Sequence, residues 1–338
     1  MRATYAPFGS HAVMLVPNLP SGFMSNLVSH FEGCLLGAMV GDSLGSRVEN
    51  ASTGLVSHRF PTTEDLYAIR PGPYGSTTEM TVAVAESLIA EPGFDGENLA
   101  RRLMARWHEV RGYGQGTSLA LARLRAGVSW QDAGDAQAGR GCYGNAAAAR
   151  SAAIGLVFHD DVSTLRWVAE EAAGITHTHS HGVEGAVIFA LAVAVALDAR
   201  GGELVPQGFF ETIAGEVQVR EYRTHLEMAA DLAAGKPTVG RIVERLGNNQ
   251  TALGSVVTAL LCFASNSDSF SDAAAAALRL GGNATAITAM TLALSGAHLG
   301  VDSIAPEWAE ELQIGELNGL GVRRIARELA AKVEKPRR

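Results

Sequence analysis

Three glycines at four-residue intervals constrain the fold of this chain more than any other sequence feature. Gly33, Gly37 and Gly41 lie in an apolar stretch of helical spacing that begins at Asn26. A four-residue interval places all three on one face of a helix. Glycine lowers helix propensity, so a stripe of glycines indicates a face against which a second backbone packs closely. We therefore expect a helix that ends at Gly45 and whose glycine face lies close to another segment of backbone.

The rest of the chain also has helical patterning. Of its 338 residues, 47% are hydrophobic and only 6% aromatic, and no alternating apolar and polar run of strand length is evident. The sequence therefore predicts an all-α, single-domain assembly of ten or more helices. Residues 50–73 and 131–145 are expected to be irregular, whereas 147–157 and 207–233 are each expected to be helical throughout.

The domain boundaries follow from the N-terminal pattern. Residues 1–23 contain a short apolar run that Pro17 and Pro20 close off, which is too short for a membrane span and atypical of a signal peptide. We expect residues 1–23 to form a flexible extension and residues 24–334 to form the helical domain. No membrane association is expected.

Charge and cysteine content narrow the possible partners and the compartment. The net charge of −8 repels phosphate backbones, which disfavours nucleic acid as a partner. The chain has three cysteines, Cys34, Cys142 and Cys262, which are far apart in sequence. Because their number is odd and their spacing is wide, we expect no disulfide framework and predict a reducing cytoplasm. The three thiols are expected to be small buried apolar groups. The oligomeric state is left open.

Two glycine-flanked turns each precede a long helical stretch rich in small residues. The first reads Tyr-Gly-Ser-Thr-Thr-Glu-Met over residues 74–80, and the second reads Gly-Gly-Asn-Ala-Thr-Ala over residues 281–286. Backbone N–H groups at a helix N-terminus bind anions. Both turns are therefore expected to present N–H groups to a common cleft.

Five segments, in order, resemble motifs of the ADP-ribosylglycohydrolase family. They are the helix ending in Gly-Asp-x-Leu-Gly at residues 41–45, the turn at 74–80, Gly144-Asn145 with Arg150, Thr176-His177, and Gly281-Gly282 with the helix that follows. The resemblance covers roughly residues 30–310. It implies an orthogonal multi-helix bundle with a cleft at the helix N-termini. It also implies that active members use two Mg²⁺ ions there to polarise a glycosidic bond of ADP-ribose.

The family's two metal-binding motifs have lost their aspartates in this chain. Against the family's Thr-Asp-Asp, the sequence has Gly75, Ser76 and Thr77; against its Asp-x-Asp, it has Asn283 and Thr285. Mg²⁺ is a hard cation that takes about six oxygen ligands, and a binuclear site needs carboxylates to offset its charge. Neutral oxygens supply no such charge, so we expect no Mg²⁺ and no other cofactor.

The resemblance assigns ligand contacts to the residues that remain. Glu49 is either an acid–base group or a ribose contact, or else a loop carboxylate without a role. Gly144 and Asn145 hold a nucleoside, or Asn145 caps the helix that follows it. His177 is expected near the cleft, and Gly282 belongs to the second turn.

Two further features carry alternative interpretations. His177, His179 and His181 alternate, which is compatible with a zinc site, but Zn²⁺ requires ligands that converge on one point. A loop that enters a helix explains the same pattern without a metal. Asp42 is expected to support a turn or a buried helix end.

Three functions are compatible with these observations. The first is a pseudoenzyme that binds ADP-ribose, a related nucleotide or an ADP-ribosylated partner protein in the old cleft. The second is a metal-independent enzyme that uses Glu49 on a glycoside or nucleotide-like substrate. The third is a structural or partner-binding protein.

Overall fold

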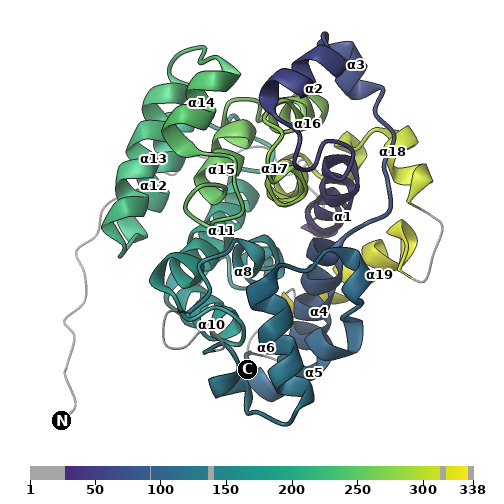
Figure 1. Ribbon diagram of the computed structural model, residues 1–338, viewed down its shortest axis with the longest axis vertical. Coiled ribbons are helices and arrows are strands. Elements are labelled where there is room, and N and C mark those ends of the chain that lie inside the picture. The colour runs from purple at the N-terminus through teal and green to yellow at the C-terminus, as the bar shows by residue number, and fades with distance from the viewer. Residues whose placement is uncertain (1–26, 92, 136–140, 313–316, 334–338) are drawn as a thin grey trace, which may run out of the picture.

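The computed structural model describes residues 27–91, 93–135, 141–312 and 317–333. Within these ranges every regular element is a helix, and the one β-type pairing is an isolated bridge between Gly144 and Thr251. The predicted all-α fold class is confirmed. In Figure 1, α1 and α17 are seen nearly along their axes at the centre, whereas α12 and α13 are seen from the side at one edge. The predicted extension, residues 1–23, lies outside the described residues.

The first half of the chain contributes α1 to α10 and one short 3-10 segment. These are α1 Leu27–Gly45, α2 Thr53–Arg59, α3 Thr63–Tyr67, α4 Ser76–Ala90, α5 Gly96–Arg106, η1 Glu109–Arg111, α6 Gln115–Arg125, α7 Trp130–Ala133, α8 Ala146–Ala149, α9 Ala152–Val157 and α10 Val162–Gly174. The second half contributes α11 Ser180–Asp198, α12 Pro206–Glu216, α13 Arg220–Ala233, α14 Val239–Leu246, α15 Val256–Ala264, α16 Phe270–Arg279, α17 Ala284–Leu299, η2 Val301–Ser303, α18 Pro306–Glu311 and α19 Gly319–Val333.

The glycine face of α1 packs along the whole of α17. A Cβ placed on Gly33 would lie 2.4 Å from the carbonyl oxygen of Gly296, and one on Gly41 would lie 2.3 Å from that of Thr288. These separations are too short for any side chain. The two helices are therefore in backbone contact, and the close approach predicted from the glycine spacing is confirmed.

Helix α11 forms a second part of the core. It is the one helix in the described ranges that is long and apolar enough to cross a membrane, yet 78% of its apolar window is buried inside the fold. Its buried residues lie on every side, and α8, α9, α10, α15 and α17 pack against it. An all-round apolar helix of this kind is typical of the centre of a large helical domain.

The structure corrects several predicted element boundaries. Residues 50–73, expected to be irregular, contain α2 and α3, which begin at the side-chain caps Ser52 and Thr62. The Thr62 cap is a full capping box with Asp65, a local signal that the sequence does carry. The stretches 147–157 and 207–233 are each divided into two helices, and α7 overlaps the start of the predicted loop at 131–145.

Candidate functional site

A cavity of about 720 Å³ opens where four helices begin. Residues at the N-termini of α4, α6, α8 and α17 line it, together with the loop that follows α1 and the loop that follows α14. Nine predicted site residues line this cavity: Glu49, Ser76, Thr77, Gly144, Asn145, His177, Gly282, Asn283 and Thr285. Residues separated by more than 200 positions in sequence therefore meet at one site.

Gly75 is the predicted site residue that is absent from the described cavity lining. Its N–H donates to Oδ2 of Asp42 at 2.7 Å, and a Cβ on Gly75 would lie 2.9 Å from the other carboxylate oxygen. Gly75 therefore permits the close approach of Asp42 to the start of α4. Its role in the structure is to hold the turn.

The sequence reasoning missed one whole side of the cavity. Tyr113, Gln115 and Thr117 line it from the start of α6, and Cys142 lines it from the loop before α8. Another missed group is a run of amide side chains, Asn248-Asn249-Gln250. Two sequence signals point to these residues: the Gly-x-Gly-x-Gly turn at residues 112–116, and the three consecutive amides between α14 and α15.

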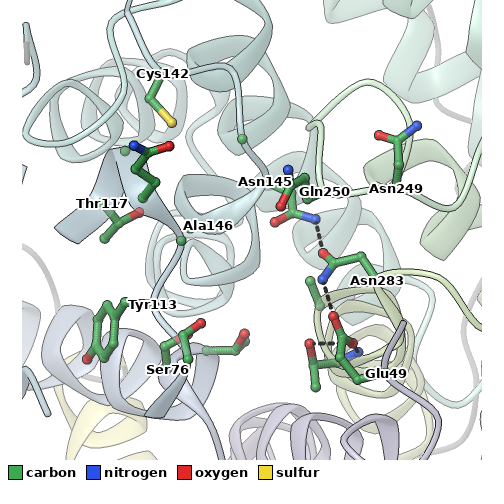
Figure 2. A pocket seen from close by; sticks show the side chains of 18 of the residues that line it. Glu49, Ser76, Tyr113, Thr117, Cys142, Asn145, Ala146, Asn249, Gln250 and Asn283 are labelled. Atoms are coloured by element: carbon green, nitrogen blue, oxygen red, sulfur yellow. Dashed lines mark hydrogen bonds between the residues drawn. The ribbon is translucent and has the colours of Figure 1, made fainter. Parts of the chain in front are cut away.

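A chain of hydrogen bonds connects Glu49 to Asn145 through Asn283. Nδ2 of Asn283 donates to Oε1 of Glu49 at 2.7 Å, and Oδ1 of Asn283 accepts from Nδ2 of Asn145 at 2.7 Å (Figure 2). The second oxygen of Glu49 accepts from the backbone N–H of Thr285 at 2.8 Å and from its hydroxyl at 2.9 Å. Both oxygens of this half-buried carboxylate are therefore engaged by neutral donors.

Of the two roles predicted for Asn145, capping the next helix is not the one found. Asn145 occupies the N-cap position of α8, but its backbone is in the right-handed helical region and its side chain makes no capping bond. Its Nδ2 donates to Oγ of Ser255 at 3.0 Å as well as to Asn283. The side chain is turned into the hydrogen-bonded chain of the cavity because partners from α17 and from the residue before α15 lie there.

Asp42 stabilises the start of α4 from inside the protein. Its Oδ2 accepts from the N–H of Thr78 at 3.0 Å, from the Thr78 hydroxyl at 2.7 Å and from the Gly75 N–H. Burial raises the pKa of Asp42 to about 6, although these hydrogen bonds oppose the rise. The sequence interpretation of Asp42 as the support of a buried helix end agrees with this geometry.

The expectation that both turns present their N–H groups to the cleft is only partly right. The N–H groups of Thr78 and Thr285 are bound by Asp42 and Glu49, and the N–H of Asn283 donates to the carbonyl of Asn248 at 2.7 Å. Two carboxylates from α1 and the loop after it thus satisfy the N-termini of α4 and α17. By contrast, the N-cap of α6 is Gly114, which provides no side-chain cap, so the first turn of α6 faces the cavity uncapped.

His177 is buried and neutral at the cavity wall. Its Nδ1 lies 2.7 Å from Oγ1 of Thr176, and its Nε2 has no hydrogen-bond partner within the part of the chain that the structure describes. Burial, reinforced by the nearby charge of Arg150, lowers the pKa of His177 to about 3. The imidazole is therefore uncharged at physiological pH.

The other two histidines of the alternating motif lie elsewhere. Nδ1 of His179 accepts the N–H of His181 at the start of α11, and the two rings are 4.9 Å apart in an edge-to-face arrangement. Over the described ranges, no three His, Cys, Asp or Glu side chains are grouped as metal ligands. The loop that enters a helix is the arrangement found.

Two buried charged groups lie behind the cavity wall. Glu79 accepts from the Tyr113 hydroxyl at 2.7 Å and lies 2.7 Å from Nδ1 of His108, which fastens the loop before α6 to α4. Arg150 is 1% exposed and donates to the carbonyl of Ala172 at 2.8 Å, without a carboxylate partner among the described residues. Burial lowers the pKa of Arg150 to about 10, so it remains a cation.

Residues 24–338 of the sequence match the ADP-ribosylglycohydrolase family. The chain belongs to the ADP-ribosylglycohydrolase family. It is 32% identical to an uncharacterized protein of Archaeoglobus fulgidus, over 90% of this chain and 95% of that protein. It is 29% identical to the mouse ADP-ribosylhydrolase ARH3, over 85% of this chain and 88% of the mouse protein.

A solved structure supports the same assignment. An ADP-ribosylglycohydrolase-related protein complex superposes with a TM-score of 0.69 at 25% sequence identity, over 91% of this chain and 99% of that chain. The predicted family and its orthogonal all-α fold are therefore confirmed.

The residues in this member of the family do not fit a pair of Mg²⁺ ions. Of the described cavity residues Glu49 alone is a carboxylate, and Ser76, Thr77, Asn283 and Thr285 are neutral. Glu49 and Asn283 already satisfy each other and their neighbours by hydrogen bonds. Two hard dications need more negative charge than one carboxylate supplies.

Proposed function

We propose that this ADP-ribosylglycohydrolase family member binds ADP-ribose, a related nucleotide or an ADP-ribosylated protein without Mg²⁺-dependent hydrolysis. The observation that carries the proposal is the hydrogen-bonded chain from Glu49 through Asn283 to Asn145. The amide of Asn283 donates to Glu49, the one carboxylate among the described residues that line the cavity. A metal ion at this point would have to break those bonds and would gain little charge compensation in return.

The cavity has the size and polarity to hold a nucleotide. Its volume of about 720 Å³ lies within the ~300–1,000 Å³ typical of small-molecule sites. Amide side chains can hydrogen-bond hydroxyl groups and base edges as donors or acceptors. Tyr143, at the cavity rim, has 52% of its surface exposed and offers an aromatic face for a base.

The uncapped start of α6 supports binding of the ligand's phosphates. Gln115, Gly116 and Thr117 line the cavity from the first turn of an 11-residue helix. Backbone N–H groups at such a terminus stabilise negative charge without a metal. In this proposal the start of α6 performs the role that the sequence assigned to the starts of α4 and α17.

The test is titration calorimetry with ADP-ribose, once in EDTA and once with Mg²⁺. We expect the same affinity in both buffers and no release of free ADP-ribose from a modified protein. Asn145→Ala should weaken binding because it breaks the chain to Asn283, whereas Asn98→Ala on α5, outside the cavity, should not. Absence of binding at millimolar ADP-ribose would overturn the proposal.

A metal-independent enzyme is the second candidate, because Glu49 is a half-buried carboxylate that lines the cavity. Both of its oxygens accept hydrogen bonds, which hold the carboxylate in a fixed position at the cavity wall. If turnover of a glycoside is found, Glu49→Gln should abolish it; unchanged turnover would remove Glu49 from the mechanism.

The cytoplasmic location and a purely structural role stay predictions.

A further inference from the structure

The guanidinium of Arg150 lies directly behind the cavity wall. Its Nη1 is 4.0 Å from Sδ of Met80, and Met80 lines the cavity. Its Nη2 donates to the carbonyl of Ala172 at 2.8 Å, whereas its Nε has no hydrogen-bond partner in the described part of the chain. A guanidinium carries five N–H donors. This buried cation is therefore poorly satisfied by the protein around it.

The titratable side chains that interact with Arg150 supply no compensating charge. They are Tyr113, Cys142 and His177, all of which line the cavity. Burial raises the pKa values of Tyr113 and Cys142 and lowers the pKa of His177 to about 3, so all three are neutral near pH 7. Glu79, the other buried charge behind the wall, is engaged by Tyr113 and by the loop before α6.

An uncompensated charge inside a protein acts over a long range. A unit charge ~10 Å away, at an effective dielectric constant of ~20, changes an equilibrium or a rate by roughly tenfold. A buried cation also costs free energy unless an opposite charge compensates it. An anionic group bound at the cavity wall would recover part of that cost, whereas a neutral group would recover none of it.

We propose that Arg150 is a specificity-determining residue, whose charge selects ligands with an anionic group at the wall formed by Met80, Tyr113 and Cys142. Figure 2 shows Tyr113 and Cys142 on the side of the cavity away from Glu49. Arg150 acts through this wall and not by contact, since it is 1% exposed. The inference rests on the proposed function, because it assumes that the cavity binds a ligand, and it adds the charge that the ligand carries at this wall.

Cys142 permits a test that needs no nucleotide. It is a partly exposed thiol of the cavity wall, whereas Cys34 and Cys262 are buried. Iodoacetate, an anion, and iodoacetamide, its neutral analogue, alkylate the same thiolate with loss of iodide. The ratio of the two rates therefore reports the potential at the wall, and peptide mass spectrometry identifies the modified residue. We expect the ratio for Cys142 in the full chain to exceed that of a model thiol such as mercaptoethanol, even though the chain as a whole has a net charge of −8.

Arg150→Gln removes the charge and keeps an amide that can donate to the carbonyl of Ala172. We expect the ratio of the iodoacetate rate to the iodoacetamide rate to fall roughly tenfold. Arg200→Gln is the matched control, because Arg200 also donates to a backbone carbonyl but lies outside the described cavity lining. An unchanged ratio in Arg150→Gln would overturn the proposal. If that variant does not fold, the parent chain decides: a ratio above that of the model thiol supports the proposal, and an equal or lower ratio overturns it.

Calorimetry with two nucleotides separates this proposal from the proposed function. Arg150→Gln should weaken the binding of ADP-ribose, a dianion, by roughly tenfold or more, and it should leave the binding of adenosine, which is neutral, unchanged. A lower alkylation ratio in the variant, together with no binding of ADP-ribose to the parent, would refute the proposed function and retain the charge selection at the wall. Equal binding of ADP-ribose by the parent and the variant would overturn the role of Arg150 and retain the proposed function.

Discussion

The side-chain amide of Asn283 donates to the carboxylate of Glu49 at 2.7 Å, across 234 positions of sequence. The motif resemblance predicts that Asn283 stands at a position where the family has an aspartate. An aspartate at 283 would repel Glu49 unless a cation separated them, whereas the amide binds Glu49 directly. In the proposed function, this contact between neutral and charged side chains takes the place of a metal ion held between acids.

Replacing Glu49 with glutamine should destabilise the fold. Glu49 accepts hydrogen bonds from Asn283 Nδ2 and from the N–H and hydroxyl of Thr285. The side-chain NH2 group of a glutamine would replace one of the accepting oxygens and would face a hydrogen-bond donor that it cannot bind. Hydrogen bonds to a charged group contribute about 1.5–3 kcal/mol each, so we expect a loss of about 2 kcal/mol or more. Urea denaturation measures it, with Glu64→Gln on exposed α3 as the control. Equal stability of the two variants would contradict this account.

Asp42 should make the protein less stable as the pH rises from about 4 to about 6. The pKa of its carboxyl is about 6 in the fold and 3.8 ordinarily, so the folded state binds the proton more tightly than the unfolded chain. The favourable contribution is complete below the unfolded pKa and is lost through the folded pKa. At ~1.36 kcal/mol per pKa unit, it amounts to at most about 3 kcal/mol.

Asp42→Asn tests this pH dependence. An asparagine oxygen can still accept from Thr78 and Gly75 but does not titrate. Denaturation curves between pH 4 and pH 7 should therefore show a smaller decline for the variant than for the parent protein. The same decline in both proteins would mean that Asp42 is not the titrating group.

The contact between α1 and α17 should not tolerate a methyl group. In Gly296→Ala, the new Cβ would lie 2.0 Å from the carbonyl oxygen of Gly33, and a backbone atom cannot rotate away. Overpacking of a core costs about 1–3 kcal/mol and occasionally more. Gly208→Ala, at an exposed position of α12, has open space for the methyl group and should be neutral or stabilising by about 0.5–1 kcal/mol. Thermal denaturation gives the Tm of both variants. Equal Tm values for Gly296→Ala and Gly208→Ala would refute the close contact.

Introducing aspartates at the four positions aligned with the family's metal motifs should create metal dependence. We expect a variant with Ser76, Thr77, Asn283 and Thr285 all changed to Asp to be destabilised in EDTA, because its carboxylates gather around Glu49. Mg²⁺ should then stabilise the variant, by about 2.7 kcal/mol when it is present at 100 times Kd. The parent protein should show no shift of Tm with Mg²⁺. A large shift in the parent would mean that its metal ligands lie elsewhere.

The sequence by itself determined the helical class, the family and nine of the residues that line the cavity. Gly33, Gly37 and Gly41 predicted a helix in close contact with another segment of backbone because four-residue spacing is a property of the helix alone. The family motifs identified nine residues of the cavity because each motif is local in sequence. The sequence did not predict the short helices α2 and α3, because the composition of residues 50–73 is typical of a loop and outweighs the signal of the two capping residues.

Only the tertiary structure decided what each polar group does at the site. Whether Asn145 caps a helix or bonds Asn283 depends on a partner 138 positions away. Which N–H groups remain for a ligand depends on Asp42 and Glu49, which reach the starts of α4 and α17 from the N-terminal part of the chain. Hydrogen bonds act over about 3 Å, so their pairing is set by spatial neighbours that local sequence patterns do not encode.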